Sequence, residues 1–403
     1  MDPGDVEYEP ISVKAVLAEM KDTAELLIDL SYSAVLHGSD EVAAEVLELE
    51  ERMDVLQMQA RMSLLMAARS PEDAEALAPV LGVVGAAEKI SDAAGDIAKI
   101  VLEDIGIPEA MRTAIPEAVE TVVRAQVAPD SDYRDTSLGD CNLETETGVR
   151  VIAIRRAGEW IVNPDRTTTF EADDVALLRG TETALSTVYE TLTGDAYDPP
   201  EPVDSSIDDL DRAVDSIVLM KNMSELAVDL AYGAVLFDSE GVAEEVVELE
   251  AEVDALKSRF EAWVLRAAPR VEDPITLRGL VHLASATEVI SDAALEISEG
   301  VLRGLDTHPV VAAAVEESDE VIVRLTVAVG SRLADASLGD LEVKTATGMR
   351  VIAVRRGDGD GDWVISPGSE TAVHDGDVLI AKGTRAGASR LADLAGADDP
   401  IDA

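Results

Sequence analysis

The feature that most constrains this chain is an internal duplication. The segment Asp29–Leu36 recurs 200 residues later as Asp229–Leu236, and Ile90–Ala94 recurs at the same offset as Ile290–Ala294. The offset grows to 203 after Arg356. A repeat of this length predicts two copies of one architecture, because equal apolar patterns bury equal faces.

The first part of each copy has helical periodicity. Apolar residues spaced alternately by four and three residues form a stripe from Val42 to Ala60, and the same spacing recurs from Val242 to Phe260. Such a stripe indicates a long helix with one buried face in an antiparallel bundle. Further helices are expected over 13–36 and 75–103, and a fourth is expected to begin at Pro108 and Pro309.

The second part of each copy alternates apolar and polar residues, as β-strands do. The predicted strands cover 149–156, 160–162 and 175–178 and their counterparts 349–356, 363–365 and 378–381. A helix is expected after Gly180 and after Gly383. The insertion that changes the offset falls in the acidic stretch 357–362, where we expect a turn.

These patterns predict an α+β protein of two tandem units, each an antiparallel helical bundle followed by a small α/β module. The predicted ranges are 11–124 and 125–193 for the first bundle and module, and 210–324 and 325–396 for the second. A Pro-rich acidic stretch, 194–209, is the expected linker.

The chain is strongly acidic, with 82 Asp and Glu against 32 Lys and Arg and a net charge of −50. This charge repels phosphates, so nucleic acid is not an expected partner. Salt screens the self-repulsion, so the composition is typical of a cytoplasmic protein from a high-salt cell. The N-terminus lacks signal-peptide features and no apolar run is long enough to span a bilayer, so direct membrane insertion is not expected.

Two sets of motifs resemble known families. The segment Glu88–Ile97 is similar to the Glu-x-x-x-Asp helix of PhoU proteins, and Glu50–Asp54 and Glu250–Asp254 are similar to their second acidic signature. Each small module resembles the C-terminal domain of regulators of potassium conductance (RCK-C, or TrkA-C). That resemblance rests on the Ser-Leu-Gly-Asp entry at Ser137–Asp140, the strand ending in Arg-Arg, a Trp-x-x-x-Pro segment and a final strand ending in Gly-Thr.

The chain departs from both families in its domain order. Complete potassium-conductance regulators carry a nucleotide-binding Rossmann domain before this module, but no Gly-x-Gly-x-x-Gly follows a strand here. We therefore expect no NAD. PhoU proteins join two helical repeats directly, whereas here the first small module separates them.

The resemblance to PhoU implies a metal site on carboxylates. Acidic pairs are common by chance in so acidic a chain, so only pairs retained in both copies count. The predicted divalent-metal ligands are Glu50, Asp54, Glu88, Asp92, Glu250, Asp254, Glu288 and Asp292. Glu25 and Asp29 are retained in the same way as Glu225 and Asp229. The alternative interpretation is a solvated acidic surface.

Arginines retained in both modules are candidate anion contacts, because phosphates bind Arg well. They are Arg150, Arg155, Arg156, Arg350, Arg355 and Arg356. In some RCK-C proteins paired modules bind cyclic di-AMP, so the resemblance implies this nucleotide as a ligand. The alternative is that these arginines pair with neighbouring carboxylates.

Nothing in the sequence indicates catalysis. The four histidines, His37, His282, His308 and His374, do not recur at duplicate positions, and no nucleophile–base or Walker pattern is present. We therefore expect that the chain is not an enzyme.

The resemblance implies a cytoplasmic regulatory protein for potassium or other cation transport. It would sense an ion or nucleotide through paired RCK-C modules, paired within the chain or in a homodimer, and act on a membrane channel, transporter or antiporter. The alternatives are a PhoU-type regulator of phosphate uptake and an adaptor that binds no ligand.

Overall fold

The computed structural model describes most of the chain. The described residues are 13–68, 70–108, 121–141, 143, 147–162, 164–180, 182–197, 207–237, 239–303, 320–357, 363–365 and 367–397. The predicted fourth helices after Pro108 and at Pro309, most of the predicted linker and most of the acidic insertion lie outside these residues.

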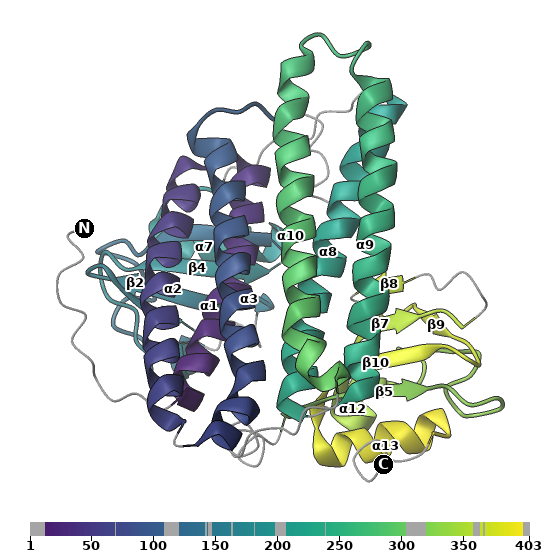
Figure 1. Cartoon of the computed structure of the whole chain (residues 1–403). Coiled ribbons are helices and arrows are strands. Elements are labelled where there is room, and N and C mark those ends of the chain that lie inside the picture. Colours follow the sequence, from purple (N-terminus) through teal and green to yellow (C-terminus); the bar gives the residue numbers. More distant parts are fainter. Residues whose placement is uncertain are drawn as a thin grey trace. The chain divides into compact units, whose positions relative to one another are not determined.

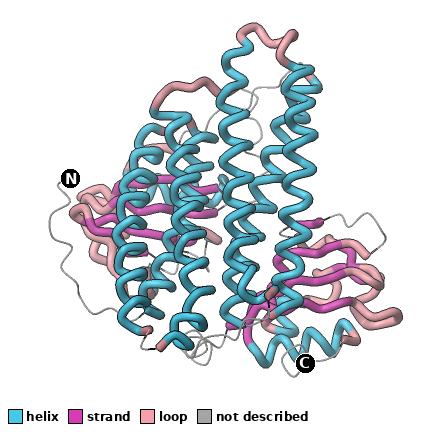
Figure 2. Tube along the Cα trace, in the orientation of Figure 1, coloured by secondary structure: helices cyan, strands magenta, loops and turns pink. Residues whose placement is uncertain are grey.

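Within the described residues, each copy contains three long helices and a four-stranded antiparallel sheet, and the second copy adds a two-stranded sheet (Figure 1). The helices are α1 (Val13–His37), α2 (Asp40–Ala67), α3 (Pro71–Leu102), α8 (Asp208–Phe237), α9 (Glu240–Ala267) and α10 (Leu277–Leu302). The predicted helical stripe is confirmed, since all its members from Val42 to Ala60 and from Val242 to Phe260 are buried. The strands belong to the small modules, as Figure 2 shows.

The first sheet has the strand order β1-β4-β2-β3 and is antiparallel throughout. Its strands are β1 (Thr121–Gln126), β2 (Arg150–Arg156), β3 (Glu159–Val162) and β4 (Val175–Gly180). The second sheet repeats this order with β5 (Glu320–Thr326), β10 (Val378–Thr384), β7 (Met349–Arg355) and β8 (Trp363–Ile365). The shorter elements are α5 (Leu138–Cys141), β6 (Ala336–Ser337), α12 (Val343–Thr347) and β9 (Ala372–Val373).

The sequence analysis predicts no strand at β1 or β5. β1 begins at Thr121, before the predicted module start at 125. Burial alternates along β1, since Val123 and Ala125 are buried while Arg124 is half-buried and Gln126 is exposed. The sequence alternates in the same way over 123–127 and 323–327, so a short strand signal is present at both places, across the predicted boundary between bundle and module.

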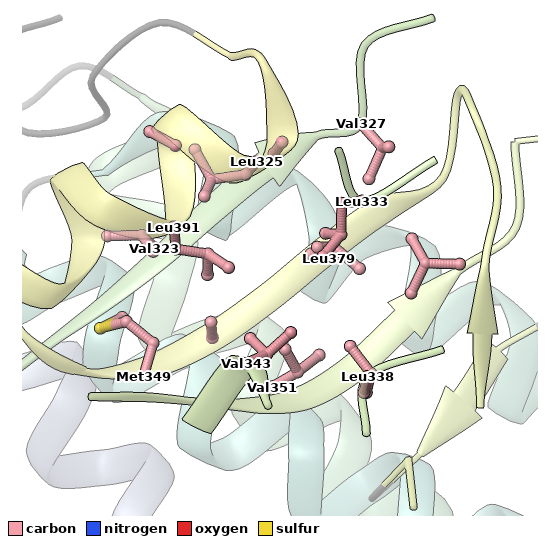
Figure 3. Close-up of a cluster of buried hydrophobic side chains, with 14 of the residues drawn as sticks. Val323, Leu325, Val327, Leu333, Leu338, Val343, Met349, Val351, Leu379 and Leu391 are labelled. Atoms are coloured by element: carbon pink, nitrogen blue, oxygen red, sulfur yellow. The ribbon is translucent and has the colours of Figure 1, made fainter. Parts of the chain in front are cut away.

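A helix covers one face of each sheet, as the sequence predicts. α7 (Glu182–Thr193) contacts β1 and β4, and α13 (Arg385–Ala395) contacts β5, β7 and β10. Figure 3 shows the second module's core, where Leu391 of α13 lies near Val323 and Leu325 of β5. The opposite face of each sheet contacts the long helices.

Contacts divide the described chain into two units that do not coincide with the two sequence copies. One unit comprises Met1–Ser63, Val84–Lys221 and Val253–Ile290, and the other comprises Leu64–Val83, Asn222–Glu252 and Ser291–Ala403. Each unit therefore combines helix segments from both copies. In the first unit the Tyr32 hydroxyl and Thr287 Oγ1 lie 2.6 Å apart. In the second, a Cβ added at Gly300 would lie 2.9 Å from Pro79.

Contacts between helices of the two copies explain how the chain can carry a small module between its two helical repeats. The first module separates the two helical repeats along the chain, yet their helices pack together within each unit. Within the described ranges, no helix combines the length and apolar character needed to cross a bilayer.

The second module's core gives the first prediction. Leu379 is fully buried among β5, β7 and α13, so Leu379→Ala should lower the free energy of unfolding by about 2–5 kcal/mol. Val329 is 85 % exposed, and Val329→Ala should change it by less than about 0.5 kcal/mol. Denaturant unfolding of the full chain in high salt measures both. Equal effects would show that this cluster is not the module's core.

Candidate functional site

A buried glutamate joins the helical bundle to the module in the first unit. Glu45 lies on the apolar face of α2, three residues after Val42 and four before Leu49, and its side chain is 4 % exposed. Two strand arginines donate to its Oε1: Arg124 of β1 through Nε at 3.3 Å and Arg155 of β2 through Nη2 at 2.5 Å. We call these three residues the first clamp.

The second unit repeats this arrangement with better geometry. Arg355 donates to both oxygens of Glu245, from Nε to Oε2 and from Nη2 to Oε1, each at 2.7 Å. Arg324 donates from Nε to Oε1 at 2.6 Å. Glu245, Arg324 and Arg355 form the second clamp. Two cations and three hydrogen bonds offset the loss of hydration that burial imposes on a carboxylate.

Electrostatics favour the charged form of the second clamp. Burial alone would raise the pKa of Glu245, but hydrogen bonds and charges from Arg355 and Arg324 outweigh it and hold that pKa below its ordinary value. The hydrogen bond to Glu245 correspondingly raises the pKa of Arg355. The carboxylate therefore stays ionised while it is buried.

The first clamp is less complete. Arg124 also donates to the exposed Glu41, from Nη1 at 2.9 Å, whereas the residue matching Glu41 in the second copy is Gly241. Within the described chain, Glu45 Oε2 and Arg155 Nε are buried and have no hydrogen-bond partner. The two clamps thus share their residue types but differ in how many polar atoms are satisfied.

Close packing holds the helices against the first strand of each sheet. The Ser33 hydroxyl of α1 donates to the backbone oxygen of Val122. At the matching position of α8, a Cβ on Gly233 would lie 2.8 Å from Ile322 Cδ1. A side chain larger than serine at position 33 would crowd β1, and any side chain at position 233 would require Ile322 to shift. Each junction therefore depends on a small residue as well as on the clamp.

The predicted anion-binding arginines are distributed over three environments. Arg155 and Arg355 belong to the clamps. Arg156 donates to Asp174 from Nε at 2.9 Å and from Nη2 at 2.7 Å, and the same partner raises its pKa.

In the second module Arg356 donates to Asp377 at 2.7 Å and to the backbone oxygen of Ala372. Arg150 and Arg350 are exposed. Four of the six arginines therefore lie against carboxylates. Anion contact by these residues stays a prediction, with Arg150 and Arg350 the accessible members.

The first set of predicted metal ligands lies on α2 and α3. Burial raises the pKa of Glu50, and repulsion from Asp92, Asp54 and Asp96 adds to the rise, although Lys99 opposes it. Lys99 donates to Asp96 at 3.0 Å, so this carboxylate group contains its own cation.

Glu88 has a separate partner, since Arg61 donates to it at 3.2 Å. Outside the predicted ligands, Arg179 donates to Asp29 at 3.0 Å and Lys21 to Glu25.

The second set differs. In the second unit, Glu250 of α9 and Asp292 of α10 place carboxylate oxygens within 4.8 Å of each other. Asp254 and Glu288 fall in the first unit, where Lys257 donates to Glu288. The residue matching Lys99 is Glu299, which pairs with Arg303 at 2.7 Å. Metal binding by either set stays a prediction.

The sequence analysis missed the clamp glutamates. A signal was present: an acidic residue at a buried position of the helical stripe, retained in both copies. Its arginine partners follow at the same separations, 79 and 110 residues, in each copy. Only a glutamate with a fixed buried partner is expected to persist at such a position.

The clamps give the second prediction. Glu245→Gln should lower the free energy of unfolding by about 3 kcal/mol, because two buried arginine contacts lose their counter-charge. Glu45→Gln should cost less, since that clamp is already incomplete. Glu244→Gln, at an exposed position beside the clamp, is the matched control. A cost for Glu245→Gln no larger than the control's would contradict the clamp.

The same variant has a defined pH dependence. The lowered pKa of Glu245 means that its contribution is fully present above the unfolded-state pKa of about 4.3 and is lost as pH falls towards the folded-state pKa. The stability difference between wild type and Glu245→Gln should therefore shrink below about pH 4. Acid titration of both proteins measures it, and a difference that grows as pH falls would be inconsistent with this sign.

Two protein-family models match the chain, one over the long helices and one over the sheets. The PhoU domain model matches residues 17–101 and 217–301, and the TrkA-C domain model matches residues 122–193 and 322–396. No curated protein matches the chain.

Two solved structures are similar at 13 % identity. PhoU from Pseudomonas aeruginosa is similar over 72 % of this chain and 96 % of that chain, with a TM-score of 0.41. The GsuK RCK domain is similar over 70 % of this chain and 64 % of that chain, with a TM-score of 0.19. Both family models match twice, in the order in which helices and sheets alternate. The chain therefore contains two PhoU domains, each followed by a TrkA-C domain.

Proposed function

We propose that the chain regulates potassium or other cation transport by passing a displacement of its TrkA-C modules to its PhoU-like helices. The observation that carries this proposal is the clamp, which ties two strands of each module to one buried glutamate of the bundle. The TrkA-C matches support a role in potassium transport systems. The transporter or channel would be a separate membrane protein.

The energies of the clamp suit this task. Removing one partner of a buried ion pair costs about 3–5 kcal/mol, whereas allosteric coupling between sites is typically about 1–3 kcal/mol. A ligand that displaces a module would therefore move the clamped helix with it, because breaking the clamp costs more than the ligand supplies. α2 and α9 become the elements that report the state of their modules.

A ligand of the modules belongs to the same proposal. Arg150 is the first residue of β2 and Arg350 the second residue of β7, and both are exposed, so they are the residues we propose for contact with a phosphate-bearing ligand such as cyclic di-AMP. Pairing of the two modules, within one chain or between two copies, would place such a ligand between them.

The PhoU matches favour a second candidate, a regulator of phosphate uptake. In that case the helices would act directly on a phosphate transporter or its sensor, and the modules would be accessory. The two candidates differ in the partner that the helices bind.

The partner is tested by affinity purification of the full chain from membranes of the source cell, in high salt to keep the acidic chain folded. The proposal predicts that a cation channel, transporter or antiporter co-purifies. Glu245→Gln should retain this partner but weaken the effect of the chain on potassium flux. A phosphate transporter as the only membrane partner would overturn the proposal.

We also propose that a divalent cation binds Glu250 and Asp292 of the second copy, because their carboxylate oxygens lie within 4.8 Å of each other. Mg²⁺ or Ca²⁺ should raise the thermal midpoint of the full chain, and chelation should reverse the rise. Asp292→Asn should abolish the rise, whereas Glu261→Gln, at an exposed position of α9, should not. A rise that survives Asp292→Asn would contradict this assignment.

A further inference from the structure

The first unit contains a cavity of about 380 Å³ between α1, α2 and the edge strand β3. Its lining combines buried and charged groups: Glu19, Asp22, Thr23, Leu49, Arg52, Trp160, Ile161 and Val162. The volume lies within the range of small-molecule sites, about 300–1,000 Å³.

The lining separates charged from apolar groups. Glu19, Asp22 and Arg52 have side chains that are 36–47 % exposed, so they lie on the solvent side, and Arg52 pairs with Glu19 at 2.5 Å. Thr23 and Leu49 are buried and form the inner side. A ligand that fits this lining carries charges of both signs at one end and apolar surface at the other.

The cavity adjoins the first clamp. Trp160 pairs in register with Arg155, and Leu49 follows Glu45 by one helical turn. The Trp160 indole N–H is buried and, within the described chain, has no hydrogen-bond acceptor. Glu45 Oε2 and Arg155 Nε also have no hydrogen-bond partner there, although Arg155 Nε lies 3.8 Å from Glu48 Oε2. Buried polar atoms are rarely left unsatisfied in a finished core, so this junction has unused hydrogen-bonding capacity.

The second copy carries the same strand residues but a different lining. Trp363 lies 6.0 Å from the Arg355 guanidinium, whose nitrogens are used on Glu245. The residues matching the cavity's polar members Glu19, Asp22, Thr23 and Arg52 are Leu219, Asn222, Met223 and Glu252. A buried methionine replaces threonine and the charge of Arg52 is reversed, so the chemistry of this cavity belongs to the first unit.

We propose that this cavity binds a small zwitterion with an apolar side chain, an α-amino acid of about the size of leucine. Its ammonium group would pair with Glu19 and Asp22, and its carboxylate with Arg52. Its side chain would pack on Leu49, Val162 and Trp160. A simple anion would meet two carboxylates, and a simple cation would compete with Arg52 for Glu19, whereas a zwitterion supplies an opposite charge to each partner of that ion pair.

Binding here would act on the clamp, a consequence that rests on the proposed function. Leu49 and Trp160 contact the ligand and stand next to Glu45 and Arg155 in the chain and in the sheet. A filled cavity would fix β3 against α2, and the first module would be held more firmly to its helix.

Calorimetric titration of the full chain tests the site without any transport partner. The probes are L-leucine, 3-methylbutylamine, which lacks the carboxylate, and 4-methylpentanoate, which lacks the ammonium group. L-leucine should bind at one site per chain, and each analogue should bind at least tenfold more weakly. Absence of binding by L-leucine, or equal binding by either analogue, would overturn the proposal.

Variants built from the chain's own second copy locate the site. Thr23→Met and Arg52→Glu introduce residues that the fold already accommodates at 223 and 252, and each should weaken leucine binding at least tenfold. Leu219→Glu, which gives the second copy the residue that the first copy has at position 19, should leave leucine binding unchanged. Thermal midpoints verify folding. Unchanged binding in Thr23→Met and Arg52→Glu would place the ligand elsewhere and contradict the proposal, whatever transporter the chain regulates.

Discussion

A carboxylate buried between two arginines decides how each module of this chain is held. Isolated, Glu45 or Glu245 would lose several kcal/mol of hydration on burial. The arginines of two neighbouring strands supply the compensation, and in the second copy Arg355 does so through two parallel hydrogen bonds. Because the fork of an arginine accepts few orientations, the clamp fixes the position of the sheet on the helix as well as its attachment.

Basic residues are scarce in this acidic chain, so the carboxylates with which its arginines pair are informative. Only 32 basic residues face 82 acidic ones, so most carboxylates have no basic partner of their own. Arginines in the strands or directly after them nevertheless donate to four of the carboxylates that are buried in the described chain: Glu45, Asp174, Glu245 and Asp377. Exposed ion pairs contribute little, about 0–1 kcal/mol, and salt weakens them. Buried pairs keep their strength in high salt, where the surface charge is screened.

The duplication preserves the helices, the strand order and the clamps but changes several polar side chains. Helical stripes, strand order and clamps recur in both copies, whereas Glu41, Lys99 and Thr23 are replaced by Gly241, Glu299 and Met223. Each replacement changes a polar contact without changing a helix. The two copies are therefore equivalent as scaffold and different as binding surface, which is how a duplicated regulator could assign separate ligands to its halves.

The sequence predicted the elements well, because periodicity reports local burial: the stripe from Val42 to Ala60 and the strand at Trp363 follow the structure. It did not predict β1, because the alternation there is short and crosses the predicted boundary between bundle and module. The clamps could not be derived from local pattern, because Glu45 meets residues 79 and 110 positions away. Comparison of the two copies could have revealed the clamps, because Glu45 and Glu245 place the same charge at the same buried position of the helical stripe.

The central claim, that the clamps bind module to helix, is tested most directly by a double-mutant cycle on Glu245 and Arg355. The free energies of unfolding of Glu245→Gln, Arg355→Gln and the double variant yield their coupling energy. The account predicts a coupling of at least about 2 kcal/mol, near the upper end for residues in one hydrogen-bond network. A coupling below about 0.5 kcal/mol would show that the two side chains act independently and that the clamp does not hold the module.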